Sequence, residues 1–391
     1  MSGVLRGQRR RRDGIVVVGS GTLFISGLTH YTRYVASALS EHTPTSVILM
    51  RKLIPRAFYP GKGRVGDVLT EASYPADMEV LDGVDWYWIP SIFRALRFLR
   101  RHQPEAVLLQ WWTGAVLHTY IVLAVAAKLR GARVLVEVHE IQDTGEAQMI
   151  GARRYVQLVG RGLMWVADGF IVHSEHDRVA LGDNYPVGDR PVKVARHGPY
   201  SHYSVADAEP LRHAPPEAIN ILFFGTIRPY KGLEDLVRAF EMLASGVDSV
   251  WLTVVGETWE NWTEPTDLIS RSPVHDRITL VNRYVSDAEA SRWFAGADIV
   301  ALPYRRSSAS GPLHMAMDAG LPVVLSDVGG LREASAGYKG VALANPEDPA
   351  DLHRALLAAI QMRGRRFVDS GSWDETAATV LDLVNDVRTR R

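Results

Sequence analysis

Two cations lie close together in the second half of the chain, where a buried strand is predicted to turn into a helix. The segment from Asn220 to Leu233 carries Arg228 and Lys231 in this turn. Ligands of open α/β sheets bind at the carboxyl ends of the strands, and a guanidinium and an ammonium group together suit a diphosphate. The alternative is a pair of ordinary surface cations, although the helix dipole disfavours positive charge there. The pair therefore predicts a phosphate-binding site.

A short loop downstream predicts a second anion-binding feature. Pro312 suits the first position of a helix, and Ser310 or Gly311 suits the cap before it. The free N–H groups and the positive dipole end of such a helix favour phosphate. We expect Ser310 and Gly311 to complete a diphosphate site opposite Arg228 and Lys231. The alternative is a plain capping loop.

The first half of the chain offers a histidine at the end of a predicted strand. His139 and Glu140 follow the buried run Val134–Val138. This position favours a functional histidine at the carboxyl edge of a sheet, with Glu140 as a side chain that could orient it. A structural histidine inside the fold is the alternative.

Metals and dinucleotide cofactors are not indicated. The chain contains no cysteine, which excludes thiolate ligands and a disulfide scaffold. His173 and His176 are three residues apart, but Ser174 and Asp177 between and beside them match a capping box that opens a helix. The glycines after the first strand do not spell Gly-x-Gly-x-x-Gly, because position 24 is phenylalanine. We expect neither a metal nor a bound cofactor.

The elements that position these residues are alternating strands and helices. Short β-branched runs, such as Ile15–Val18 and Val134–Val138, alternate with helical patterns, and the alternation restarts at Asn220. At 391 residues the chain also exceeds the roughly 250 to 300 residues at which single cores stop growing. We predict two Rossmann-like α/β domains facing each other across a cleft, at residues 1–205 and 206–365. Residues 366–391 are predicted to form a final helix that crosses back to the first domain.

Composition limits the partners and the compartment. Lys plus Arg and Asp plus Glu both number 44, so the formal net charge is zero and nucleic acid is not indicated as a partner. The apolar run Ile15–Val18 is too short for a signal-peptide core, and Gly114–Ala127 is too short to span a bilayer. A cytoplasmic protein is therefore expected.

Further motifs follow the cationic turn in a fixed order, and together they resemble a known family. The pattern Phe-Gly-x-x-Arg-x-x-Lys-Gly around Arg228 and Lys231 resembles the donor-phosphate loop of retaining GT-B glycosyltransferases of family four. Four further stretches resemble the C-terminal half of that family: Val285–Asp287, Ala297–Pro303, Ala319–Val324 and Gly329–Glu333. The resemblance covers roughly residues 220–335, and the order of the motifs is more specific than any one of them.

The resemblance implies a GT-B fold and the transfer of a hexosyl group from a UDP- or GDP-linked sugar, with retention of the anomeric configuration and without a metal. Arg228, Lys231 and His139 are implied as catalytic residues, with His139 contacting the donor sugar. It implies an acceptor-side loop at Gly21, Ser26 and Gly27. The implied donor contacts are Gly225, Thr226, Tyr284, Val285, Ser307, Ser308, Ser310, Gly311 and Glu333.

The sequence departs from the family at two positions. The family carries two glutamates separated by seven residues, which contact the donor sugar and the ribose. Here Ser307 and Met315 hold these places. A serine can hydrogen-bond a sugar hydroxyl, whereas a thioether is only a weak acceptor. The departure leaves two alternatives open: a non-catalytic sugar-nucleotide-binding partner of another transferase, or a nucleotide-sugar epimerase.

The acceptor is expected to be a glycan, a glycolipid or a small molecule. Trp86, Trp88, Trp111 and Trp112 cluster in the first half, next to a basic start. Buried core positions are the more common role of tryptophan. Exposed tryptophans would instead suit stacking on a sugar or a peripheral contact at the inner face of a membrane that holds a lipid-linked acceptor.

Overall fold

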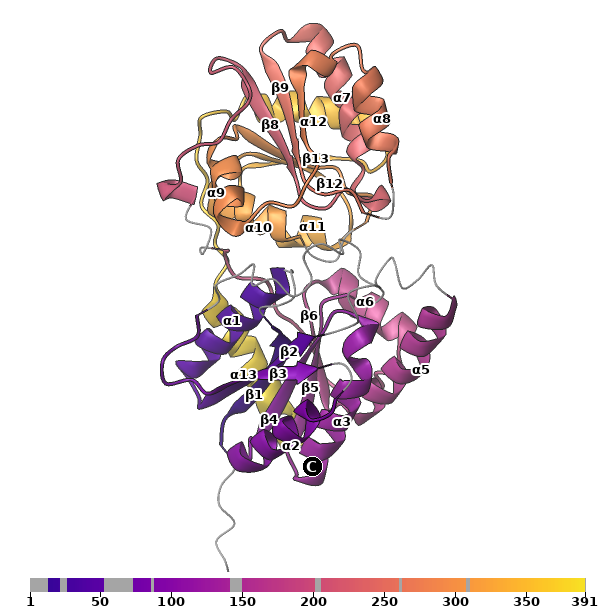
Figure 1. Ribbon diagram of the computed structural model, residues 1–391, viewed down its shortest axis with the longest axis vertical. Helices are drawn as coiled ribbons and strands as arrows, with labels where there is room; N and C mark the ends of the chain where they lie inside the picture. Colours follow the sequence, from indigo (N-terminus) through magenta and orange to yellow (C-terminus); the bar gives the residue numbers. More distant parts are fainter. Residues whose placement is uncertain are drawn as a thin grey trace, which may run out of the picture.

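The computed structural model describes residues 13–21, 27–52, 73–85, 88–140, 150–200, 205–259, 262–306 and 310–390. Within these ranges the chain forms two α/β domains, one above the other in Figure 1.

The N-terminal domain is built on a seven-stranded parallel sheet with the order β3-β2-β1-β4-β5-β6-β7. Its central strands are mostly apolar and are buried on both faces, as expected for a parallel sheet covered by helices. The strands are β1 (Ile15–Ser20), β2 (Thr45–Lys52), β3 (Val80–Asp85), β4 (Ala106–Trp111), β5 (Arg133–Val138), β6 (Gly169–Val172) and β7 (Val192–Val194).

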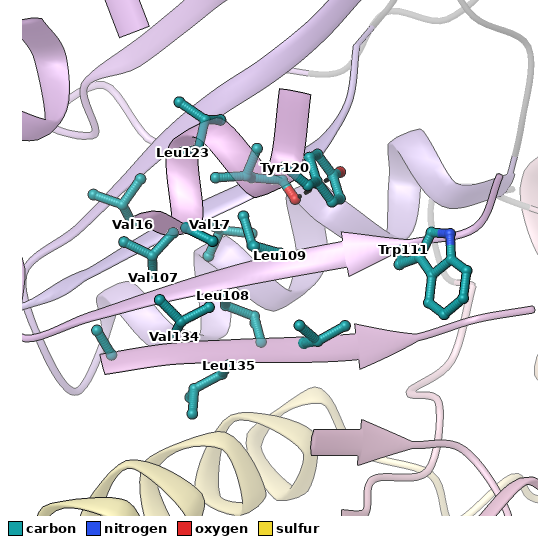
Figure 2. Close-up of a cluster of buried hydrophobic side chains, with 14 of the residues drawn as sticks. Val16, Val17, Val107, Leu108, Leu109, Trp111, Tyr120, Leu123, Val134 and Leu135 are labelled. Carbon is teal, nitrogen blue, oxygen red and sulfur yellow. Dashed lines mark hydrogen bonds between the residues drawn. The ribbon is translucent and has the colours of Figure 1, made fainter. Parts of the chain in front are cut away.

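Helices connect these strands and cover the sheet. Figure 2 shows part of the core, where valines and leucines of β1, β4 and β5 pack beside Tyr120 and Leu123. The Tyr120 hydroxyl donates a hydrogen bond to the Gln110 carbonyl at 2.8 Å, so even this buried phenol is satisfied. The helices of this domain are α1 (Gly27–Ser40), α2 (Ser91–His102), α3 (Leu117–Leu129), α5 (Ile150–Val166) and α6 (Glu175–Asn184).

The C-terminal domain repeats this arrangement with a six-stranded parallel sheet in the order β10-β9-β8-β11-β12-β13. The strands are β8 (Ile219–Phe224), β9 (Val250–Val255), β10 (Ile278–Val281), β11 (Ile299–Leu302), β12 (Val323–Ser326) and β13 (Val341–Ala344). The helices are α7 (Leu233–Gly246), α8 (Glu264–Arg271), α9 (Asp287–Ala295), α10 (Gly311–Asp318), α11 (Gly329–Ala334) and α12 (Pro349–Ile360). Two Rossmann-like sheets confirm the predicted fold class.

The last helix, α13 (Trp373–Thr389), lies on the N-terminal domain (Figure 1). Its apolar side chains, including Ala377, Val380 and Leu383, belong to the same buried cluster as β1, β4 and β5. It packs against α1 on one side and β5, β6 and β7 on the other. The chain therefore passes between the domains twice, once before β8 and once after α12.

The strand order places the ligand-binding edge of each domain. In both sheets the chain starts in the middle, moves out to one edge, and then continues on the other side of the first strand. The point where the direction reverses lies between β1 and β4 in the first domain and between β8 and β11 in the second. Ligands of open α/β sheets bind outside the carboxyl ends of the strands at this switch point.

Gly232, which precedes α7, allows a close approach that another residue could not make. Its φ is +64°, and a Cβ atom there would lie 2.1 Å from the Pro303 carbonyl oxygen. We expect Gly232→Ala to lower the free energy of unfolding by about 2 kcal/mol or more, because alanine would add both left-handed strain and a clash with backbone. The measurement is the urea midpoint. Gly246→Ala, at the exposed end of the same helix and with open space at its Cβ, is the control and should be neutral or stabilising. Equal midpoints for the two variants would contradict the prediction.

Candidate functional site

The C-terminal domain gathers several of the predicted phosphate-binding residues at its switch point. The loop after β8 carries Arg228 and Lys231, and the loop after β11 leads to Ser310 and α10. Gly225 brings the two loops together: its φ is +118°, and a Cβ atom there would lie 3.6 Å from Pro312. Two segments that are about 80 residues apart in the sequence therefore form one edge of the sheet.

Arg228 and Lys231 are both only 8% exposed. The Lys231 ammonium lies 3.7 Å from the centre of the Tyr304 ring, and the Arg228 guanidinium lies 5.6 Å from the ring of Trp259. Both distances are in the range of cation–π contacts. Aromatic walls thus hold the two cations in place. This environment differs from the surface alternative considered from the sequence.

A carboxylate of the N-terminal domain influences the pKa of Lys231 in the C-terminal domain. Burial lowers the pKa of its ammonium, while Tyr230 and the carboxylate of Glu140 act in the opposite direction. Glu140 belongs to the N-terminal domain and directly follows His139. Lys231 is therefore within electrostatic reach of the segment after β5.

The start of α10 adds backbone donors to this edge. Ser310 is the N-cap, and its Oγ accepts a hydrogen bond from the Leu313 N–H at 3.3 Å, with Pro312 in the first turn. The same hydroxyl donates to the Tyr304 hydroxyl at 3.4 Å, which links the cap to the ring beneath Lys231. Open space surrounds the position of a Cβ atom at Gly311. Because Pro312 has no N–H and the Leu313 N–H is bound to Ser310, Gly311 supplies the N–H group at the helix start that can bind an anion.

The N-terminal domain contributes a buried polar network centred on Glu137 of β5, which is fully buried. The Tyr31 hydroxyl donates to one carboxylate oxygen at 2.6 Å, and the Gln110 amide donates to the other at 3.0 Å. The Thr32 hydroxyl in turn donates to the side-chain amide oxygen of Gln110 at 2.6 Å. Burial alone would raise the pKa of Glu137, but its interactions with His139, His173 and Tyr31, hydrogen bonds among them, bring it below its usual value. Glu137 is thus held as a carboxylate.

His139 is oriented by this network and by a second histidine. Its Nε2 lies 3.7 Å from a Glu137 carboxylate oxygen, and its Nδ1 lies 3.0 Å from Nε2 of His173. His173 Nδ1 lies 3.0 Å from the Ala195 carbonyl, which can only accept, so this nitrogen carries the proton. In neutral His173 the other nitrogen then accepts from His139 Nδ1–H. The hydrogen bond to His173 thus orients the ring of His139.

Two hydrogen-bonded contacts join the domains beside this site. His30 of α1 lies 2.9 Å from the Asp287 carboxylate at the start of α9. The Glu333 carboxylate accepts from the backbone N–H groups of Glu175 and His176, at 2.6 and 3.0 Å, and thereby caps α6. Glu333, predicted as a donor contact, thus binds the N-terminal domain in this structure; its role toward a donor stays a prediction.

The other predicted contacts are divided between the two domains. Thr226 and Tyr284 are half-buried, and Val285 is buried in the core. Gly21 is buried after β1, where its N–H donates to the Met50 carbonyl, and Gly27 is exposed at the start of α1. Ser26, Ser307 and Ser308 lie outside the described residues.

Met315, which holds the place of the second family glutamate, is 3% exposed and packs in the core of the C-terminal domain. It is therefore a core residue rather than a substitute ribose contact. Trp111 and Trp112 are also buried, and Trp88 is half-buried with its N–H donated to Thr119. The proposed cap at Ser174 is confirmed, because its Oγ accepts from the Asp177 N–H. His176, by contrast with His173, is exposed, so these two do not form a site.

Sequence reasoning missed most of the network around His139. Tyr31, Glu137, His173 and His197 meet there from α1, β5, the end of β6 and the linker. One signal was available: Glu137 is the single charged residue inside the apolar run Val134–Val138. A carboxylate inside a buried strand requires partners, and these partners identify the site.

Comparison with known proteins finds sequence similarity to glycosyltransferases. Residues 218–362 match the family model described as "Glycosyl transferases group 1". The chain is 33% identical over 189 residues to the D-inositol 3-phosphate glycosyltransferase of Xylanimonas cellulosilytica, which covers 45% of the chain and 44% of that relative. It is 29% identical over 326 residues to a glycogen synthase of Mycobacterium tuberculosis, covering 77% of the chain and 70% of the relative. The first relatives are matched over only 44 to 58% of their length.

The fold as a whole resembles a solved sucrose-phosphate synthase from Thermosynechococcus elongatus. The TM-score is 0.64 at 16% sequence identity, over 97% of this chain and 94% of that one. At this identity the likeness concerns the fold alone, and it agrees with the GT-B arrangement of two Rossmann-like domains. The C-terminal domain, in addition, carries the sequence pattern of group 1 glycosyltransferases.

Proposed function

We propose that the chain is a retaining glycosyltransferase that moves a hexosyl group from a UDP- or GDP-linked sugar to a hydroxyl of a glycan, a glycolipid or a small molecule. The observation that carries this proposal is the pair of buried cations, Arg228 and Lys231, next to the start of α10 at the switch point of the second sheet. The match of residues 218–362 to group 1 glycosyltransferases supports the same conclusion.

Transfer breaks the bond between the sugar and the diphosphate, and negative charge grows on the leaving group. Arg228, Lys231 and the N–H group of Gly311 are donors fixed before the reaction, so they stabilise this charge without reorganising. Their burial strengthens the interaction, because little water screens it. The proposed chemistry requires no metal for this step.

Retention follows if the acceptor hydroxyl attacks from the face that the diphosphate leaves. The departing phosphate oxygen then accepts the proton of that hydroxyl, so no separate protein base is needed. His139, on the opposite domain, contacts the donor sugar in this proposal, and His173 and Glu137 act as positioning residues that hold its ring. The remaining donor contacts are proposed at Thr226, Tyr284 and the backbone after β11.

A panel of sugar nucleotides tests the proposal. A donor present at a hundred times its dissociation constant stabilises the folded state by about 2.7 kcal/mol, which thermal unfolding detects. The stabilising donor is then incubated with acceptors, and products are identified by mass. Release of the nucleoside diphosphate that requires an acceptor supports transfer. Conversion of the sugar without an acceptor would indicate an epimerase, and binding with no product under any acceptor would indicate a non-catalytic partner.

We also propose a peripheral contact with a bilayer that holds a lipid-linked acceptor, through one face of α5. Arg154, Leu158, Arg161 and Trp165 recur at helical spacing and are all exposed, with Leu158 at 76% and Trp165 at 81%. The helix has no acidic residue. Exposed apolar side chains between arginines suit the surface of a bilayer with anionic lipids. Among the described helices, none is long and apolar enough to cross a membrane.

Replacing Leu158 and Trp165 together by glutamate should reduce binding to vesicles that contain phosphatidylglycerol at least tenfold, because the face loses apolar area and gains repulsive charge. Sedimentation with vesicles measures this, and pure phosphatidylcholine vesicles should bind the unaltered chain weakly. Val368→Glu, at an 84% exposed valine in the segment between α12 and α13, is the control. Equal sedimentation of the double variant and the control would refute the membrane proposal without affecting the transfer reaction.

A further inference from the structure

Three imidazole rings converge at the carboxyl edge of the N-terminal sheet. His139 follows β5, His173 follows β6, and His197 lies in the segment after β7. Each ring offers a nitrogen atom, and the three nitrogens all lie within 4.8 Å of one another. The ring centre of His173 lies 4.5 Å from the ring centre of His139 and 4.5 Å from that of His197. Rings from three separate elements thus surround one point.

His197 has no other evident use for its polar atoms. Both of its ring nitrogens are buried, and among the described residues neither has a hydrogen-bond partner. Leaving such a buried polar group without a partner destabilises the folded state, because the group has lost its hydrogen bonds to water. Its ring is held instead by aromatic neighbours, stacked on His314 at 4.9 Å and tilted against Tyr31 at 4.6 Å. A buried imidazole that is held in position and whose nitrogens lack hydrogen-bond partners is suited to bind a ligand.

The ring of His173 is oriented as that of a metal-binding histidine is. His173 directs Nδ1 to the Ala195 carbonyl, so Nε2 points to the cluster. Histidine ligands typically use the second nitrogen in this way, toward a carbonyl or a carboxylate. The Glu137 carboxylate lies 3.7 Å from His139 Nε2 and supplies negative charge behind the rings. The protein therefore provides both the ligand atoms and their supporting partners.

We propose that His139, His173 and His197 form a binding site for a divalent transition-metal ion of the zinc type. Three histidine nitrogens with an open fourth position are a common zinc ligand set. Ligand nitrogens at about 2.0 to 2.1 Å from zinc lie roughly 3.4 Å apart in a tetrahedron, so the site closes by a movement of about an ångström.

The ion is not needed for the proposed transfer, and it would compete with it. His139 cannot bind an ion and contact the donor sugar at the same time. A filled site therefore lowers transfer activity, a consequence that rests on the proposed function. Binding of the ion itself does not rest on it, so the two can fail separately.

Cobalt is the probe for the site, because tetrahedral Co²⁺ absorbs visible light strongly while Zn²⁺ is silent. The full chain without a polyhistidine tag is stripped with EDTA and titrated with Co²⁺, and Zn²⁺ is then added to displace it. We expect one equivalent of bound cobalt with a tetrahedral spectrum. His173→Gln and His197→Gln should each weaken binding at least about 100-fold, since loss of a ligand exceeds the 10- to 100-fold effect of losing a supporting partner. His176→Gln changes an exposed histidine three residues from His173 and should bind like the unaltered chain.

Absence of the tetrahedral spectrum, or equal affinity in His197→Gln and His176→Gln, would overturn the proposal. Thermal unfolding in EDTA shows whether each variant is folded. X-ray absorption of the zinc-loaded unaltered chain does not depend on any variant, and it should count three imidazole ligands. One imidazole or none would equally overturn the site.

Discussion

Replacing Arg228 and Lys231 together by alanine is expected to abolish measurable donor binding and to lower kcat/KM by about 10² to 10⁴. Each charge-assisted hydrogen bond contributes roughly 1.5 to 3 kcal/mol, and each 1.4 kcal/mol corresponds to a factor of ten. Both side chains are buried, so solvent cannot replace them. Calorimetry with the stabilising sugar nucleotide measures binding, and initial rates measure kcat/KM.

Each single variant should show part of this loss of binding and activity. Arg228→Ala should also weaken binding of the free nucleoside diphosphate. Arg238→Ala is the control, because Arg238 lies on the adjacent helix α7, is exposed, and pairs only weakly with Asp235 at 3.5 Å. Donor affinity and turnover in the double variant that match those of the control would show that the diphosphate binds elsewhere.

His139→Gln is expected to lower kcat by about 10² to 10³ while the dissociation constant of the nucleoside diphosphate stays within about twofold. The ring belongs to the domain opposite the cations, so its loss should affect the sugar and the transition state rather than the diphosphate. Steady-state kinetics and calorimetry with the nucleoside diphosphate separate the two effects.

His176→Gln serves again as the matched control, because it removes an exposed imidazole from the same part of the domain. Two results would count against the assigned role of His139. One is an unchanged kcat; the other is an equal loss of affinity for the free nucleoside diphosphate, which would indicate a disturbed fold.

Much of the fold could be predicted because the central strands are local signals. Ile15–Val18 and Asn220–Phe224 are apolar runs that lead into amphipathic helices, and both form the first strand of their sheet. The edge strands of the sheet give weaker signals in the sequence. β7 has three half-buried residues, and β3 contains two aspartates and a glycine. Such strands are defined by their neighbours in space, which a single sequence does not reveal.

The two halves of the site differ in the same way. Arg228, Lys231 and Ser310 lie within short motifs whose secondary structure the sequence predicts, so the edge that they share follows from topology. The His139 network joins residues from position 31 to position 197. Neither helical nor strand periodicity indicates which of these side chains meet, and only the tertiary structure brings them together.

The most direct test of the central claim is a crystal structure of the chain with the nucleoside diphosphate of its donor. The account predicts that the phosphate closest to the sugar position lies within hydrogen-bond distance of Arg228, Lys231 and the N–H of Gly311, on the side facing His139. A diphosphate bound away from the carboxyl ends of β8 and β11, with both cations directed elsewhere, would contradict it.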